Sequence, residues 1–517
     1  MTDTSFCIGL FYYIGECMDY IVKLNGIEIK VSKGENLLRV LQSKGFFIDV
    51  PCGGVGTCGK CKVELDGEIV LACNVTVDRD MEVEISDKNS SFDILTWGNI
   101  ANINVEDREY TEGYAVVVDI GTTTVVLYLI DFATASIIST HSYMNPQKAY
   151  GADVISRINY TINNENGTET LRNSIVSSIN RGVDTFDVEK SKIRSISLVG
   201  NTTMLHFLLG YETAQMAVIP FTPITVDYQE FVAKDIGIKI CDNTKAYILP
   251  CVSAYVGADL IAAVVSTDME NQLDGYSMVV DIGTNGEIAV GNMEKIYVAS
   301  TAAGPAFEGA NIECGVGGIE GAIDKVVYND NGFSYTTIGG KNPVGICGSG
   351  IISIISTLID AEVIDYTGRI QDKDEQVNED MKDRIIEGDT GNSFMVCDNI
   401  AITQKDVREL QNAKAAIAAG IEVMLNKVDL DEVKNLYIAG GFGSKIDINS
   451  AFRIKLLPEK LKSKIQIIGN AAGVGGIMTI MSKDKLEAMI DIGKSAENVE
   501  LSGNSEFSDL YIDNMFF

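Results

Sequence analysis

The same pattern occurs twice in the chain, 162 positions apart: an apolar strand-like run, then Asp-Ile-Gly-Thr, then a second apolar run. The first copy is AVVVDIGTTTVVLYL at 115–129, and the second is SMVVDIGTNGEIAVG at 277–291. A spacing this long indicates a duplicated domain, because solenoid repeats are only about 20 to 50 residues long. From Tyr114 onward, apolar runs alternate with helical stretches, which is typical of α/β architecture. We therefore predict two related α/β lobes.

Each copy of the repeat places a carboxylate, a flexible turn and hydroxyl groups at the end of a strand. Glycine lets a phosphate approach closely, backbone N–H groups and hydroxyls donate to it, and an aspartate can hold Mg²⁺ through water. One copy alone would be interpreted as a simple turn, but two copies facing each other would clamp the phosphates of a nucleotide. The expected catalytic carboxylates are Asp119 and Asp281. The expected phosphate contacts are Gly121, Thr122, Thr123, Thr124, Gly283, Thr284, Asn285 and Gly286.

A third glycine-rich turn follows the apolar run 436–439 and consists of Gly440, Gly441, Phe442 and Gly443. Bare backbone at this place would let adenine or ribose lie against the chain, whereas the alternative is an ordinary turn from strand to helix. The three motifs, in this order, resemble the phosphate-1, phosphate-2 and adenosine motifs of the actin, sugar-kinase and heat-shock ATPase superfamily. The resemblance implies two ribonuclease-H-like lobes around an ATP cleft, with 198–204 and 345–350 as connecting segments.

Four of the eleven cysteines lie close together in the sequence: Cys52, Cys58, Cys61 and Cys73. Four thiolates are the ligand set of an iron–sulfur cluster, and the glycines between them allow a tight loop with free N–H groups. Zinc is the alternative, but zinc sites usually pair two short Cys-x2–4-Cys knuckles, and Cys73 stands alone. An iron–sulfur cluster is therefore favoured. The other seven cysteines show no spacing that would suggest a second cluster.

The sequence around these cysteines predicts a β-grasp domain. Alternating runs turn at Asn25-Gly26 and again at Asp66-Gly67, both of which are strong hairpin signals. A short helix is expected at 35–43, between the first hairpin and the cysteine loop. Residues 19–88 resemble a 2Fe–2S ferredoxin with the x5-x2 cysteine spacing of adrenodoxin-like members.

Charge and composition exclude several classes of partner. The chain has 41 Lys and Arg against 72 Asp and Glu, a net charge of −31, which repels nucleic acid and anionic lipid. Its two histidines make a histidine-rich metal site unfavourable, and His206 is expected in the core. No apolar run reaches the length of a membrane span, and the N-terminal residues lack the positive charge of a signal peptide. We expect a cytoplasmic protein.

A ferredoxin joined to an ATPase of this fold resembles the reductive activators of corrinoid proteins, including O-demethylase activating enzymes, over residues 19 to about 495. The resemblance implies a 2Fe–2S cluster, ATP and Mg²⁺, with ATP hydrolysis driving one-electron reduction of cob(II)amide to cob(I)amide. It also implies a corrinoid protein as partner and an upstream electron donor, and a homodimer is a further candidate assembly. Only residues 89–112 separate the modules here, where some relatives insert a linker domain and a middle domain.

Two further segments lie outside the three motifs. Residues 303–310 resemble a cleft loop of this family, with Glu308 near Mg²⁺ or the attacking water, and a purely structural loop is an equal alternative. Thr403 is expected to cap a helix with Asp406 at its third position. Two other functions stay open: a small-molecule kinase with a redox-regulated ferredoxin domain, and an ATP-responsive iron–sulfur redox sensor.

The expected protein is an α/β multidomain chain with an N-terminal ferredoxin domain and two ATPase lobes. Its expected parts are an extension at 1–18, the ferredoxin domain at 19–88, a linker at 89–112, the first lobe at 113–272, the second lobe at 273–498 and a tail at 499–517.

Overall fold

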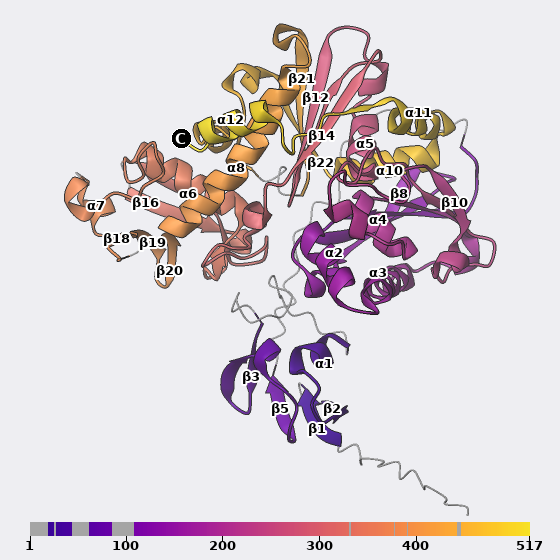
Figure 1. Cartoon of the computed structure of the whole chain (residues 1–517), viewed down its shortest axis with the longest axis horizontal. Helices are drawn as coiled ribbons and strands as arrows, with labels where there is room; N and C mark the ends of the chain where they lie inside the picture. The colour runs from indigo at the N-terminus through magenta and orange to yellow at the C-terminus, as the bar shows by residue number, and fades with distance from the viewer. Residues whose placement is uncertain are drawn as a thin grey trace, which may run out of the picture. The chain divides into compact units, whose positions relative to one another are not determined.

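The computed structural model describes residues 19–24, 27–43, 61–84, 108–329, 332–376, 378–389, 391–441 and 446–517. The chain divides into two compact units, Met1–Lys88 and Asn89–Phe517 (Figure 1). The expected extension 1–18, linker residues 89–107, and the site residues Cys52, Cys58, Phe442 and Gly443 lie outside the described residues. No helix in the described ranges combines the length and the apolar content needed to cross a bilayer.

The first unit contains a five-stranded sheet with the order β2-β1-β5-β3-β4 and one helix, α1. Both expected hairpins form, and at the second turn Asp66 and Gly67 have φ values of 51° and 88°, as a type I′ turn requires. β5 pairs in parallel with β1 and antiparallel with β3. β5 is not predicted from the sequence, because MEVE is short and half of it is glutamate. The bounds are β1 Asp19–Leu24, β2 Ile27–Ser32, α1 Leu37–Ser43, β3 Lys62–Leu65, β4 Glu68–Leu71 and β5 Met81–Glu84.

In the second unit, each copy of the repeat forms the centre of a six-stranded sheet. The lobe 1 sheet has the order β10-β11-β9-β6-β7-β8, and the lobe 2 sheet has the order β22-β21-β12-β13-β14-β23. The lobe 1 strands are β6 Tyr114–Ile120, β7 Thr124–Asp131, β8 Ser136–Met144, β9 Ile193–Gly200, β10 Gln229–Val232 and β11 Lys245–Ile248. The lobe 2 strands are β12 Tyr276–Ile282, β13 Gly286–Gly291, β14 Ile296–Thr301, β21 Val433–Ala439, β22 Ile465–Gly469 and β23 Glu497–Asn498.

The duplication extends to the pairing of the strands. β6, β7 and β8 form an antiparallel meander, as do β12, β13 and β14. Each first strand has a parallel neighbour on its other side, so that Asp119 pairs with Val199 of β9 and Asp281 pairs with Ala439 of β21. The two Asp-Ile-Gly-Thr turns therefore occupy equivalent positions in the two sheets, as the repeat predicts.

Two helices, α5 Ala258–Ser266 and α10 Ala471–Met481, pack against each other between the two sheets (Figure 1). A Cβ added to Gly475 would lie 1.9 Å from the carbonyl oxygen of Ala262, so the two backbones touch. α10 also packs on β6 and β9 of lobe 1. α10 lies within the expected lobe 2 range 273–498 and packs on the lobe 1 sheet, so it bridges the two lobes. The lobes are connected by α5 and α10, and the segments 198–204 and 345–350 lie inside lobe 1 and lobe 2 respectively.

Helices cover the remaining face of lobe 1, and a subdomain that runs from Ala322 to Thr403 is inserted in lobe 2. The lobe 1 helices are α2 Val154–Asn163, α3 Gly167–Asp184 and α4 Thr202–Leu209, and His206 of α4 is buried as expected. The other elements of lobe 2 and the C-terminal region are β15 Ala322–Asn329, β16 Gly332–Thr337, β17 Gly345–Ile346, α6 Gly348–Asp360, α7 Glu379–Lys382, β18 Ile385–Ile386, β19 Ser393–Cys397, β20 Ile400–Thr403, α8 Gln404–Leu425, α9 Ile448–Arg453, α11 Lys483–Ser495 and α12 Ser505–Asp513.

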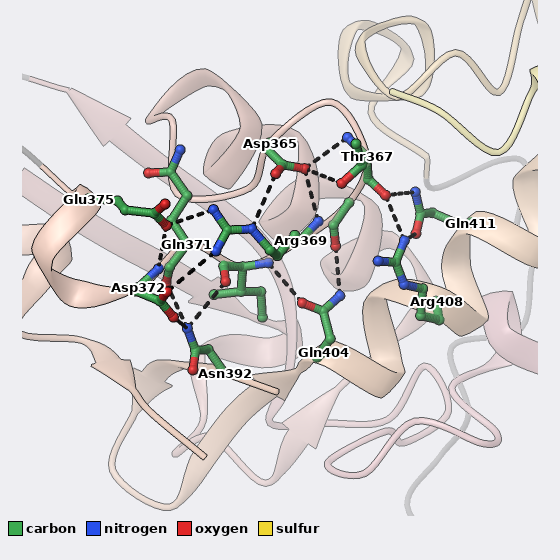
Figure 2. Close-up of polar contacts among 12 residues, drawn as sticks. Asp365, Thr367, Arg369, Gln371, Asp372, Glu375, Asn392, Gln404, Arg408 and Gln411 are labelled. Carbon is green, nitrogen blue, oxygen red and sulfur yellow. Dashed lines mark hydrogen bonds and ion pairs between the residues drawn. The ribbon is translucent and has the colours of Figure 1, made fainter. Parts of the chain in front are cut away.

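Helix α8 packs on the lobe 2 sheet and anchors the subdomain. Thr403 caps α8 and Asp406 completes the capping box, as the sequence predicts. Figure 2 shows the polar contacts that join the turn around Asp365 and Arg369 to this helix. The side chain of Gln404 accepts a hydrogen bond from the Ile370 N–H (2.8 Å) and donates one to the Gly368 carbonyl (2.7 Å). The subdomain is thus fixed to the N-terminal end of α8.

Residues 499–517 pack on lobe 2 and do not form a separate tail. Helix α12 lies along α8, and Phe517 is buried in the lobe 2 core. Lys414 of α8 donates a hydrogen bond to the Phe516 carbonyl (2.7 Å), and Gln411 donates one to the Met515 carbonyl (2.7 Å). Phe517 is therefore a core residue, and Phe507 and Leu510 of α12 are partly buried against the lobe 2 core.

Candidate nucleotide site and cluster ligands

The two repeat aspartates face each other where strands β6 and β12 end. Burial raises the pKa of Asp119 to about 7, although the Asn470 side chain opposes the shift by donating a hydrogen bond to its Oδ2 (2.9 Å). Burial also raises the pKa of Asp281 to about 7, with the Asp259 and Asp119 charges adding to the rise. The Asp119 charge is among the causes that raise the pKa of Asp281, and the Asp259 charge acts on both, so the two expected carboxylates belong to one acidic group.

Two further carboxylates, which were not predicted, complete this acidic group. Asp259 lies in the first turn of α5, and burial raises its pKa to about 6. Glu287 follows the second motif directly on β13; burial, then the Asp259 and Asp281 charges, raise its pKa well above the usual range. Among the described residues no three His, Cys, Asp or Glu side chains are close enough to chelate a metal directly. The arrangement fits Mg²⁺ held through water, which is how Mg²⁺ commonly binds in phosphate sites.

Two buried side chains donate hydrogen bonds to the backbone carbonyl oxygens of the first phosphate loop. Asn145 donates a hydrogen bond to the Gly121 carbonyl (2.8 Å), and Arg157 donates to the Thr122 carbonyl (2.5 Å). Both side chains are fully buried, and burial lowers the pKa of Arg157 to about 10. Neither residue was predicted, because an isolated polar residue within a helix or turn carries no periodic signal. A Cβ at Gly121 would lie 2.8 Å from the Thr124 carbonyl oxygen, so the tight turn requires glycine.

Glu308 connects the two phosphate loops. Its Oε2 accepts a hydrogen bond from the Thr123 hydroxyl (2.5 Å), and its Oε1 accepts one from the Thr284 hydroxyl (2.6 Å). The Glu308 side chain therefore reaches both motifs at once. Glu308 ends the 3-10 turn η7 Pro305–Glu308, whose preceding side chain, Phe307, is buried in the lobe 2 core.

The backbone on both sides of Glu308 is fixed by glycines. Gly304 and Gly309 have φ values of 81° and 78°, which favour glycine, and a Cβ at Gly309 would lie 2.3 Å from the Val316 carbonyl oxygen. η7 also packs against α8. The backbone of Glu308 is therefore held in place by the core.

The third motif lies beside the second. Gly440 has a φ of 93°, and a Cβ there would lie 2.4 Å from the Asp281 Oδ1. An added Cβ at Gly441 would have open space around it. The first glycine is therefore required by the close approach of the Asp281 carboxylate, and the second leaves bare backbone at the surface, as an adenosine contact requires. The other two residues of this motif are outside the described ranges.

Two of the four predicted cluster ligands are described, and they lie together. Cys61 and Cys73 are buried, with their sulfur atoms 3.2 Å apart. This is too long for a disulfide bond, whereas two thiolates on one tetrahedral ion lie about 3.8 Å apart for bonds of about 2.3 Å. If the two sulfur atoms moved slightly further apart, both could bind the same iron atom. Asn36 donates a hydrogen bond to the Cys73 carbonyl (2.8 Å) and fixes the backbone of this ligand.

Comparison with known proteins accounts for nearly the whole chain. Residues 22–90 match the 2Fe-2S iron-sulfur cluster binding domain, 114–272 match the RACo middle region, and 275–517 match the C-terminal, ASKHA domain of RACo. A solved structure described as a reductive activator for a corrinoid, iron-sulfur protein is 28% identical, with a TM-score of 0.71 over 96% of this chain and 98% of that one. The chain belongs to the family of corrinoid reductive activators.

Relatives with assigned names in this activator family are similar over most of their length. The corrinoid activation enzyme RamQ of Eubacterium limosum is 29% identical, covering 95% of this chain and 97% of the relative. The [Co(II) methylated amine-specific corrinoid protein] reductase of Methanosarcina barkeri is 24% identical, covering 77% of this chain and 76% of that protein. The predicted fold class, a ferredoxin domain with ASKHA lobes, is confirmed.

The family matches also correct the comparison of modules. The middle region of the activators is present in this chain as residues 114–272, which form most of lobe 1. The expectation that a middle domain is missing is therefore wrong, because the residues expected as the first ATPase lobe are the ones that match the middle region. The C-terminal match extends to residue 517 and includes the segment after 498, in agreement with its packing on α8.

Proposed function

We propose that this chain uses ATP to drive the one-electron reduction of a corrinoid protein from cob(II)amide to cob(I)amide. The observation that carries the proposal is that one chain holds both a pair of cluster-type cysteines and two phosphate loops that meet at Glu308. Relatives matched over nearly the full length are named for corrinoid activation. The kinase and redox-sensor alternatives are not favoured, because neither is suggested by those relatives.

The proposed cluster ligands are Cys52, Cys58, Cys61 and Cys73. A 2Fe–2S cluster bound there would supply one-electron transfer at a low potential, about −400 mV for plant-type ferredoxins. The described part of the domain contributes burial: Cys61 is 1% exposed and Cys73 is 8% exposed, so solvent is largely kept from that side. A separate electron donor is needed to supply each electron, and we propose one as a second partner.

In the nucleotide cleft, we assign roles to the residues that the structure brings together. The Thr123 and Thr284 hydroxyls and the N–H groups of both loops would donate to the phosphates. Asp119 and Asp281 would hold Mg²⁺ through its waters, and this ion would neutralise phosphate charge. Glu308 would orient the attacking water and accept its proton. The Gly440–Gly443 turn would contact adenosine.

ATP helps the electron transfer through a change in conformation. A one-electron equilibrium shifts tenfold for each 59 mV, approximately, so an acceptor of lower potential than the cluster is reduced only to a small extent unaided. A nucleotide shifts such an equilibrium only if it binds two states differently. The two lobes, connected by α5 and α10, are a suitable two-state element. We propose that closure on ATP favours a complex in which cobalt is easier to reduce, and that hydrolysis releases it.

The proposal is tested by mixing the whole protein anaerobically with a corrinoid protein in the cob(II)amide state, a low-potential chemical reductant and MgATP. The expected result is appearance of cob(I)amide absorption together with ATP hydrolysis that the corrinoid protein stimulates. ADP in place of ATP is the control and should leave cobalt unreduced. Transfer of phosphate to a small molecule without any cobalt reduction would instead establish the kinase alternative.

A further inference from the structure

The Glu308 carboxylate and a bound phosphate would require the same two hydrogen atoms. Each threonine hydroxyl has a single hydrogen to donate, and Thr123 and Thr284 both donate theirs to Glu308. An ionised carboxylate and an ionised phosphate are both pure acceptors, so they cannot share one hydroxyl donor at full strength. The contacts in this structure and the phosphate contacts proposed above are therefore alternatives.

The Thr123 contact also crosses between the lobes. Thr123 belongs to the turn between β6 and β7 of lobe 1, whereas Glu308 and Thr284 belong to lobe 2. One carboxylate thus joins the first phosphate loop to the second through two short hydrogen bonds. Bonds of this type to a charged group are about twice as strong as neutral ones, so they contribute to holding the lobes at their present separation.

The backbone of Glu308 has little freedom to move away. Phe307 is 1% exposed within the lobe 2 core, and Gly309 lies directly against the Val316 carbonyl. The Glu308 side chain itself is only partly buried. Release of the two hydroxyls therefore requires a rotation of the Glu308 side chain and no rearrangement of η7.

We propose that Glu308 is a latch, which holds the two phosphate loops together through Thr123 and Thr284 and is displaced by the phosphates of the nucleotide. This inference rests on the nucleotide site of the proposed function. The latch weakens nucleotide binding, because each binding event must first break two hydrogen bonds. The latch also keeps the Glu308 carboxylate bound to the threonines until the phosphates have bound. Only then can Glu308 contact the attacking water.

The test is ADP binding, measured by calorimetry on the full chain, for Glu308→Ala, Glu308→Asp and the control Glu313→Gln. Glu308→Asp keeps the charge, but its side chain is one methylene shorter and cannot reach both threonines. Glu313 is exposed on the same loop, so the control removes one charge outside the latch. We expect both Glu308 variants to bind ADP about tenfold more tightly than wild type, since two charge-assisted bonds no longer compete. The control should bind as wild type does.

Hydrogen exchange provides an independent measurement. Without nucleotide, the amides of 119–124 and 282–286 should exchange faster in both Glu308 variants than in wild type, and with saturating ADP the difference should vanish. Unchanged ADP affinity and exchange in both variants overturn the latch. Tighter binding in Glu308→Ala but wild-type binding in Glu308→Asp also overturns it, because repulsion between charges would then suffice. If the wild-type chain binds no adenine nucleotide, the proposed function itself fails.

Discussion

The Asn470 side chain donates a hydrogen bond to the Asp119 carboxylate, although the two residues are 351 positions apart in the chain. Asn470 also donates to the Tyr128 hydroxyl (2.9 Å) and caps α10 by accepting from the Gly473 N–H (3.1 Å). The start of the helix that connects the lobes is thus bonded to the first phosphate loop. Any rotation of α10 changes the surroundings of Asp119, which is the kind of coupling that an ATP-driven motion needs.

Replacement of Asn470 separates this coupling from helix capping. Asn470→Ser keeps a cap but is too short to reach Asp119, whereas Asn470→Ala loses both. Both variants should hydrolyse ATP at least about tenfold more slowly, since Asp119 loses a hydrogen bond to its charged form. Only Asn470→Ala should also lose about 1 kcal/mol of unfolding free energy from the missing cap. Thermal unfolding and ATPase rates measure the two effects, and full activity in Asn470→Ser would contradict the coupling.

Loss of a cluster ligand should affect electron transfer and leave the nucleotide site intact. Cys61→Ser is expected to abolish the red-brown visible absorption and cobalt reduction, while ADP affinity stays within about twofold of wild type. Cys241→Ser is the matched control, because this half-buried thiol lies in lobe 1 and outside any predicted ligand set. Visible absorption spectra of anaerobically prepared protein show whether each variant still binds the cluster. A wild-type spectrum for Cys61→Ser would refute the ligand assignment, and Cys58→Ser should behave like Cys61→Ser.

The stability of the second unit should depend on pH through Lys414. Burial, with repulsion from Lys455 as a smaller cause, lowers the pKa of Lys414 to about 7 from an ordinary value of 10.5. Between these two pH values the unfolded chain holds a proton that the folded chain has released. The free energy of unfolding therefore rises with pH from about 7 to about 10.5, because the unfolded state binds more protons.

The variant Lys414→Met should remove this rise. Relative to Lys414→Met, wild type should gain about 1 to 3 kcal/mol of unfolding free energy between pH 7 and pH 9.5. Lys405→Met removes an exposed lysine from the same helix and should follow the wild-type curve. Denaturant unfolding at a series of pH values measures the slopes. Parallel curves for wild type and Lys414→Met would show that Lys414 keeps an ordinary pKa in the folded chain.

The two glycines of the third motif should respond differently to alanine. Gly440→Ala places a methyl group against the Asp281 carboxylate and strains a φ of 93°, so it should reduce both stability, by about 1 to 3 kcal/mol, and ATP hydrolysis. Gly441→Ala meets open space and should leave stability unchanged while it weakens ADP binding at least about fivefold. Equal ADP affinity for Gly441→Ala and wild type would argue against an adenosine contact at this turn.

Features determined by neighbouring residues were predictable from the sequence. The Asp66-Gly67 turn, the Thr403 cap and the two Asp-Ile-Gly-Thr turns each depend on a few adjacent residues, and all are confirmed in the structure. The long spacing of the repeat was sufficient to predict two lobes. The proximity of Thr123, Thr284 and Glu308 was predicted only as a common cleft, since their hydrogen bonds depend on how the lobes meet.

Features determined by distant contacts were missed for physical reasons. Arg157 and Asn145 hold a loop through its carbonyl oxygens, and such bonds leave no periodic pattern. Helix α10 is buried along its whole length, so its sequence lacks the polar face that marks a surface helix. The last residues, 499–517, are polar in part, but Phe507, Leu510 and Phe517 pack on a lobe 2 core that is built from segments distant in the sequence.

The backbone contact between α5 and α10 determines how far a small event in the cleft is transmitted. Gly475 leaves no room against Ala262, so the helices cannot slide past this point without a clash. A rotation about the contact remains available, and in a rotation displacement grows with distance from the axis. Asp259 lies in the first turn of α5 and Asn470 caps α10, whereas the subdomain formed by β15 to β20 lies away from these two helices, on the outer side of lobe 2 (Figure 1). A small rotation between α5 and α10 would therefore displace this subdomain by more than it displaces the phosphate loops.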